Sequence, residues 1–84
     1  MPRYFFDTDD GHARLDDDVG LELTDDQAAR DAATRAMGEM AREYLPRSDG
    51  PQRNITILVR NATGATILHL ALSFAIHQPT GSPQ

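Results

Sequence analysis

The chain has 84 residues, no cysteine and a formal net charge of −5, from thirteen acidic residues against eight arginines and no lysine. A chain of this length forms one small domain that buries only about 60% of its unfolded surface. The lack of cysteine excludes disulfides, thiolate zinc sites and a thiol nucleophile. The acidic balance and scattered arginines argue against nucleic-acid binding by the isolated chain, because that binding needs a basic surface.

The chain shows no signal for a membrane or for secretion. A membrane-spanning helix needs about 20 consecutive apolar residues, and no stretch of the chain comes close to this length. The N-terminal segment becomes acidic after six residues, which is too early for a signal peptide. We therefore expect a cytoplasmic protein without membrane contact. One domain is expected over residues 1–76, followed by a polar, Pro- and Gly-containing disordered tail over 77–84.

The N-terminal segment is typical of a short antiparallel hairpin. Residues 3–6 ("RYFF") are aromatic and strand-like, and residues 12–15 ("HARL") form a short return strand. Between them, Asp10 and Gly11 are residues that tight turns favour. A second acidic turn at 16–20 ("DDDVG") leads toward the next element.

A helix is predicted from Thr24 to about Leu45. Thr24 is the expected N-cap, with Gln27 three residues later as in a capping box. Pro46 ends the helix, because the residue before a proline avoids helical geometry. One face carries alanines and larger apolar side chains at helical spacing and is expected to pack on a sheet: Ala29, Ala32, Ala33, Ala36, Met40 and Tyr44.

A second hairpin follows the helix. Residues 54–60 ("NITILVR") alternate between apolar and other side chains, residues 61–64 ("NATG") fit a hairpin turn, and residues 65–76 form the last strand. The order is therefore ββαββ. It predicts an α+β fold, in which an antiparallel sheet carries one helix on one face.

Six aspartates between residues 6 and 20 suggest a metal site or a catalytic carboxylate cluster. A calcium loop of the EF-hand type needs glycine at position 6 and glutamate at position 12, and neither a start at Asp7 nor one at Asp16 supplies them. Aspartate is also a favoured turn residue. We therefore interpret the aspartates as turn residues and expect no metal and no cofactor, with a weak Mg²⁺ or Ca²⁺ site between the two turns as the alternative.

Catalytic motifs are absent from the sequence. His12, His69 and His77 are not spaced as a metal triad, and Ser48 and Ser73 lie in no nucleophile motif. A small sheet with one helix also leaves little room for a ligand-sized cleft. The sequence therefore predicts no catalytic residue and no enzymatic activity, and an enzyme that uses the acidic turns is the weaker alternative.

Several motifs occur together in one order. They are "MPRYFF" at the N-terminus, an Asp-Gly turn, "DDVGLEL" before a Thr-Asp pair and an Ala/Arg-rich helix, and a C-terminal "I.VRN.TG..IL.L..SF" pattern. Together they resemble a domain-of-unknown-function family of small bacterial proteins, over nearly the whole chain. The resemblance implies the ββαββ fold and no activity. The layout is more loosely similar to the N-terminal part of HicB-type antitoxins.

We expect a small non-catalytic interaction or accessory module, with an antitoxin-like partner-binding protein as the alternative. A homodimer is expected, because one helix covers only one face of the sheet and large apolar surfaces are rarely left exposed. The expected interface lies on the opposite face and comprises Phe5, Leu58, Ile67 and Ala71. A smaller stripe on the helix is the second candidate: Thr34, Gly38, Ala41 and Leu45.

Overall fold

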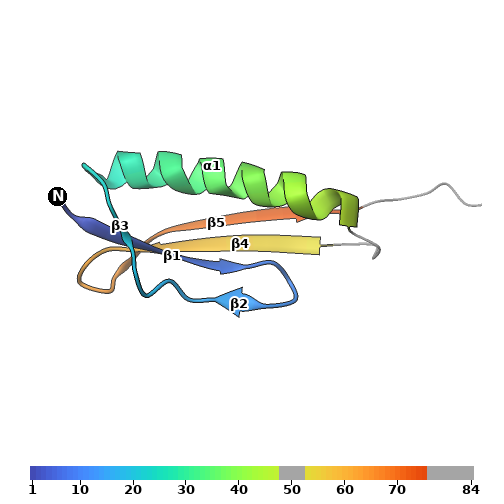
Figure 1. Cartoon of the computed structure of the whole chain (residues 1–84), viewed down its shortest axis with the longest axis horizontal. Helices are drawn as coiled ribbons and strands as arrows, with labels where there is room; N and C mark the ends of the chain where they lie inside the picture. Colours follow the sequence, from blue (N-terminus) through green and yellow to red (C-terminus); the bar gives the residue numbers. More distant parts are fainter. Residues whose placement is uncertain (48–52, 76–84) are drawn as a thin grey trace, which may run out of the picture.

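The computed structural model describes residues 1–47 and 53–75, so the expected tail at 77–84 lies outside the described residues. One helix lies along one face of an antiparallel sheet (Figure 1). The elements are β1 (Arg3–Asp9), β2 (Arg14–Leu15), β3 (Leu21–Glu22), α1 (Asp26–Tyr44), a 3₁₀ turn η1 (Leu45–Arg47), β4 (Arg53–Arg60) and β5 (Thr66–Phe74). The α+β class and the ββαββ order are confirmed, with β3 as an additional two-residue strand.

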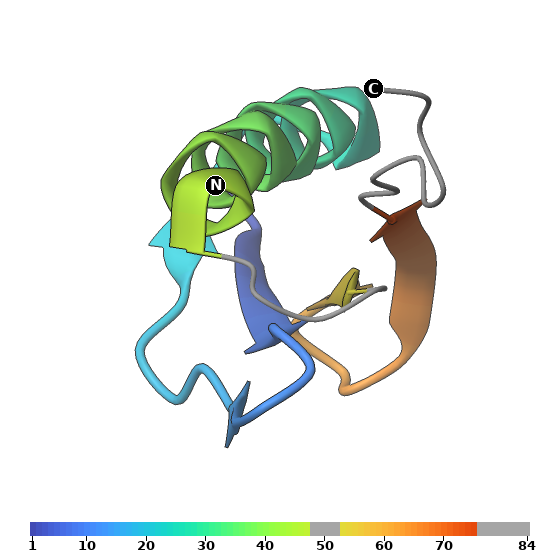
Figure 2. The ribbon, with the colours of Figure 1, turned by 90° about the vertical axis from the view of Figure 1, so that its right-hand side faces the viewer.

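The strand order in the sheet is β2–β1–β4–β5. The short β3 pairs with the first residues of β1, and β2 pairs with its last residues. The two hairpins join where β1 pairs with β4, with Phe5 opposite Arg60 and Asp9 opposite Thr56. In the view along the helix, β1, β4 and β5 follow one another below α1, with β5 on the outside (Figure 2). Strand β5 therefore forms one edge of the sheet.

The core lies between α1 and the sheet. The side chains of Ile55, Ile57 and Val59 on β4 are fully buried, in one cluster with Ala29 and Ala33 of the helix. Alanine lets a helix lie close to a sheet, so the larger strand side chains fill the space. Burial of these alanines confirms the expected inner face.

The rest of the inner face of α1 is less uniform. Ala36, Met40 and Tyr44 are partly buried and pack against the core, as expected. Met37 is a buried core residue that the predicted face did not include. Ala32 is only half-buried and is not part of this core.

The helix begins later than predicted. Asp25, not Thr24, is the N-cap, and its Oδ1 accepts a hydrogen bond from the Ala28 N–H at 2.8 Å. The Gln27 side chain donates to Asp31 at 3.0 Å instead of turning back to the cap. The predicted N-cap at Thr24 is therefore wrong by one residue. Both residue types cap helices well, and aspartate also places its charge at the positive end of the helix dipole.

Gly38 lies on the outer side of α1, and a Cβ atom built there would meet nothing within 4 Å. We expect Gly38→Ala to raise the free energy of unfolding by about 0.5–1 kcal/mol, since alanine is the better helix former and there is no clash to offset the gain. Urea unfolding of both proteins measures the change. A destabilised variant would show that something packs closely against Gly38.

Candidate functional site

The carboxylate of Asp7 is buried, at 5% exposure, on the face of the sheet that points away from α1. Arg60 Nε donates to its Oδ2 at 2.7 Å, and Arg60 Nη2 donates to its Oδ1 at 3.1 Å. Because Arg60 is opposite Phe5 in the β1–β4 ladder, Asp7 and Arg60 are diagonal neighbours on one face. The guanidinium also lies over the Phe5 ring, 5.1 Å from its centre.

Asp17 attaches the second acidic turn to this ion pair. Its backbone N–H donates to Asp7 Oδ1 at 2.9 Å, and its carbonyl accepts from Arg60 Nη2 at 2.9 Å. Its carboxylate accepts from the Phe6 N–H at 3.1 Å, in the stretch of β1 between the part that pairs with β3 and the part that pairs with β2. Asp17 thus supplies a partner to a backbone group where neither short strand reaches.

Hydrogen bonding keeps both carboxylates ionised. Arg60, followed by the Asp17 N–H, holds the pKa of Asp7 below its usual range despite burial. Burial raises the pKa of Asp17. Hydrogen bonds from the backbone N–H groups of Gly20, Phe6 and Val19 lower this pKa by more than burial raises it, so the pKa of Asp17 is also below its usual range. Such carboxylates are weak bases at neutral pH, whereas acid–base catalysis favours a pKa near the working pH. The arrangement is suited to holding chain segments together.

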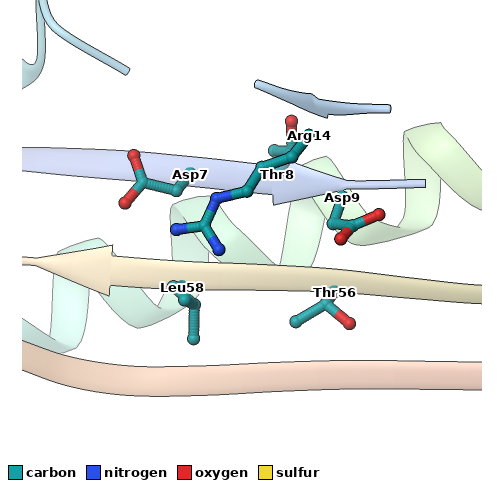
Figure 3. A pocket seen from close by; sticks show the side chains of 6 residues that line it. All are labelled: Asp7, Thr8, Asp9, Arg14, Thr56 and Leu58. Carbon is teal, nitrogen blue, oxygen red and sulfur yellow. The ribbon is translucent and has the colours of Figure 1, made fainter. Parts of the chain in front are cut away.

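A small hollow of about 80 Å³ lies beside the ion pair (Figure 3). It is lined by Asp7, Thr8, Asp9, Arg14, Thr56 and Leu58. The Arg14 side chain lies across β1 toward Asp7, and its Nε contacts Asp16 Oδ1 at 2.9 Å. Sites for small organic ligands usually exceed about 300 Å³, so this hollow has room for little more than water or a small ion.

Aspartates of the first acidic turn bond to the backbone of the turn. Asp9 Oδ1 accepts from the Gly11 N–H, and Asp10 Oδ1 accepts from the N–H groups of His12 and Ala13, each at 2.9 Å. Donation by Ala13, then by His12, holds the pKa of Asp10 below its usual range. These bonds confirm the interpretation as turn residues for Asp9 and Asp10, and the bonds from the Val19 and Gly20 N–H groups to Asp17 confirm it for Asp17. The interpretation is wrong for Asp7, which lies within β1 and pairs with Arg60.

The acidic turns are expected not to bind divalent cations. Within residues 1–47 and 53–75, no three histidine, aspartate or glutamate side chains are placed to hold a metal ion together. We predict that millimolar Ca²⁺ or Mg²⁺ leaves the melting temperature almost unchanged, since only a ligand of the folded state raises it. Thermal unfolding with and without each cation is the measurement. A rise of several degrees, lost in Asp16→Asn or Asp18→Asn, would restore the metal interpretation.

The expected interface residues do not form one patch. The Asp7–Arg60 ion pair separates Phe5 from Leu58 on the face away from α1. Ala71 is exposed on that face in β5. Ile67 packs partly against the core and lines a hollow with residues of α1, because the register of β5 shifts opposite Val59 and Arg60. Of the four, Leu58 and Ala71 are near neighbours and the other two lie apart.

The remaining candidate residues are scattered. His12 and His69 are both exposed, in the first turn and on β5, and His77 lies outside the described residues. Ser73 donates to Asn54 Oδ1 at 2.7 Å across the last hairpin, and Ser48 lies outside the described residues. These positions bring no nucleophile next to a histidine.

Tyr4 joins the start of β1 to the start of α1. Its hydroxyl donates to Asp26 Oδ1 at 2.6 Å, and this hydrogen bond, with burial and the nearby acids, raises the pKa of Tyr4 to about 12. In an absorbance titration at alkaline pH, we expect Tyr4 to ionise well above the ordinary value of about 10. The Tyr4→Phe variant should lack this late component. A variant that retains it would show that another group is responsible.

The two edges of the sheet differ. The edge at β1 is covered by two-residue strands and the Asp17 turn, whereas β5 presents nine residues whose outer side pairs with no strand of the described chain. Strand β5 holds no Asp, Glu, Lys, Arg, Pro or Gly. Its helix-facing side chains are only partly buried: Ile67, Leu68, Leu70, Leu72 and Phe74. Natural edge strands usually carry charges, prolines or bulges that prevent pairing. Strand β5 has no charge or proline, and its one bulge, at Ile67, lies near its start, so the stretch from Leu68 to Phe74 is an open edge.

Comparison with known proteins places the chain in a family. No helix of the described residues is both long and apolar enough to cross a membrane. No curated protein and no solved structure matches the chain. A family model described as a domain of unknown function, DUF6894, matches residues 3–73, from the start of β1 to the end of β5. The chain therefore belongs to the DUF6894 family of domains of unknown function.

Proposed function

We propose that this protein is a non-catalytic interaction module of the cytoplasm, which binds a partner polypeptide by adding a strand to the open edge of β5. The observation that carries the proposal is this edge, with nine uncharged residues and a row of partly buried apolar side chains beside it. In strand addition, backbone hydrogen bonds provide affinity and the alternating side chains provide specificity. Strand β5 offers backbone groups on its outer side that pair with no strand of the described chain, and alternating apolar side chains.

The acidic end of the molecule supports a non-catalytic role. The carboxylates of Asp7, which is buried, and of Asp17, which is half-buried, are ionised and bonded to Arg60 or to backbone N–H groups. The hollow beside them is far smaller than a typical ligand site. These groups hold β1, β4 and the second acidic turn together, so their bonds are used within the fold.

Two matched variants test this function. Ala71→Lys places a charge on the β5 edge, and Asn54→Lys places the same charge on the same exposed face one strand inward. Tagged versions of both and of the wild type are purified from cells that produce the protein naturally. Copies of the chain or another protein should be retained by the wild type and by Asn54→Lys and lost from Ala71→Lys. Equal retention by all three versions would overturn a role for the β5 edge.

An antitoxin-like role is the second candidate, and the acidic segment around β2 and β3 favours it. Leu15 and Val19 are each 71% exposed and Leu21 is 50% exposed, among Asp16, Asp18 and Glu22. Exposed apolar groups within an acidic surface suit a basic partner protein. Val19→Ser should then release a partner that Ala71→Lys retains, and a complex insensitive to salt would contradict this role.

A further inference from the structure

We infer that the strand added to β5 is the β5 strand of a second copy, antiparallel to the first and related to it by a two-fold axis at Ala71. This inference rests on the proposed function and names its partner. It yields one continuous antiparallel sheet, β2–β1–β4–β5 followed by the same strands in reverse order, with both helices on the same face. Three observations support it.

The first observation is that β5 is complementary to itself. Residues directly opposite in an antiparallel pair point to the same face, so a two-fold axis through a residue sets apolar rows side by side. With the axis at Ala71, Leu68 lies opposite the partner copy's Phe74 position and Leu70 lies opposite its Leu72 position. The four apolar side chains that alternate along β5 from Leu68 to Phe74 are then paired. An axis at Leu70 would instead set Phe74 opposite Thr66.

The second observation is the distribution of charge. Seven of the thirteen acidic residues lie between Asp7 and Glu22, in β1, β3 and the acidic turns, at the side of the sheet opposite β5. Two copies with a net charge of −5 each repel one another, and like charges across an interface are costly. Strand β5 carries no formal charge. Contact at β5 therefore keeps most acidic residues at the far edges of the combined sheet.

The third observation is uncovered surface between α1 and β5. A hollow of about 190 Å³ is lined by Asp26, Gln27, Arg30, Ile67 and Leu68. Because Arg30 faces this hollow, helical spacing puts Thr34 and Ala41 on the same flank of α1. These residues are small, and the side chains of β5 below them are only partly buried. A second copy would place the apolar side chains of its own β5 and the adjacent side of its own helix against this surface.

Engineered disulfides test the orientation and the register. The chain has no cysteine, so an introduced cysteine is the sole thiol. Opposite residues of antiparallel strands have Cα atoms about 4.5–5.5 Å apart, within the range that a disulfide spans. Under mild oxidation, Ala71→Cys should form a disulfide dimer efficiently. Ala62→Cys, exposed in the β4–β5 turn, is the control for random collisions and should remain reduced.

Mixtures of two variants fix the register. With the axis at Ala71, residue 69 of one copy lies opposite residue 73 of the other, so a mixture of His69→Cys and Ser73→Cys should form the mixed dimer. His69→Cys alone should not, because two such residues lie about 13 Å apart along the strands. Preferred linkage of His69→Cys to Ala71→Cys would move the axis to Leu70 and overturn the register.

Sedimentation equilibrium of the wild type, Ala71→Lys, Asn54→Lys and Leu58→Asp separates the remaining outcomes. We expect a dimer at tens of micromolar for all except Ala71→Lys, whose dissociation constant should rise at least tenfold. A monomeric wild type overturns self-pairing, while retention of a different protein through β5 would still support the proposed function. A dimer broken by Leu58→Asp and not by Ala71→Lys would place the interface on the face away from α1.

Discussion

Asp7→Asn is expected to destabilise the protein by about 2–4 kcal/mol at neutral pH. The variant keeps the shape of the side chain and removes its charge, so Arg60 loses a bidentate partner in a largely buried setting, and breaking a buried ion pair is strongly destabilising. An 84-residue domain has about 4–12 kcal/mol of stability in total, so the effect is large. Urea unfolding measures it.

Asp16→Asn is the matched control for this change. Asp16 pairs with Arg14, but both side chains are more than half exposed, and exposed ion pairs contribute little. Its stability should therefore stay close to that of the wild type. Equal losses in the two variants would show that Asp7 acts only through the net charge of the acidic segment.

The effect of Asp7→Asn should depend on pH in one direction. The pKa of Asp7 is lower in the folded chain than its usual value, so folding favours the ionised form. The stabilisation is complete above the ordinary pKa of about 4 and is lost as the pH falls through the lower folded value. The difference between the wild type and Asp7→Asn should therefore shrink below about pH 4. A difference that stays constant down to pH 2 would contradict the ion-pair origin.

Local patterns were sufficient to predict most of the fold. The alternation in residues 54–60, the alanine-rich face of the helix and the glycines of the turns each reflect short-range geometry, and the structure bears them out. The start of the helix was misplaced because Thr24 and Asp25 are both good caps, and only contact with Ala28 decides between them. The bulge that turns Ile67 toward α1 has no evident sequence signal.

The Asp7–Arg60–Asp17 cluster was not predicted, because its members are 10 and 53 residues apart in the chain. The sequence showed that aspartate is abundant but not which aspartate becomes buried, since that depends on the β1–β4 register. One signal was available: Asp7 lies inside an aromatic strand, where a charged residue needs a partner. The expected interface failed to form one patch for the same reason, because this ion pair lies within it.

Gly20→Ala is expected to destabilise the protein by about 2–4 kcal/mol. Gly20 has a φ of +80°, which costs other residues about 1–2 kcal/mol. An added Cβ would also lie 2.8 Å from Arg3 Cγ and 2.8 Å from Phe5 Cε2. Neither neighbour moves freely, since Arg3 donates to the Val19 carbonyl at 2.8 Å and the Phe5 ring lies against the Arg60 guanidinium. Overpacking of this kind adds about 1–3 kcal/mol.

Gly64→Ala separates the two contributions. Gly64 has a similar φ of +89° in the β4–β5 turn, but a Cβ there meets nothing within 4 Å. The free energy of unfolding of Gly64→Ala should therefore fall only by the cost of the positive φ, about 1–2 kcal/mol. The excess loss in Gly20→Ala, measured by urea unfolding of both variants, then reports how tightly the second acidic turn packs on β1. If the two variants lose equal stability, the second acidic turn moves away from Phe5 at little cost. The hydrogen bonds of Asp17 to Phe6, Asp7 and Arg60 then hold this turn less tightly than their lengths indicate.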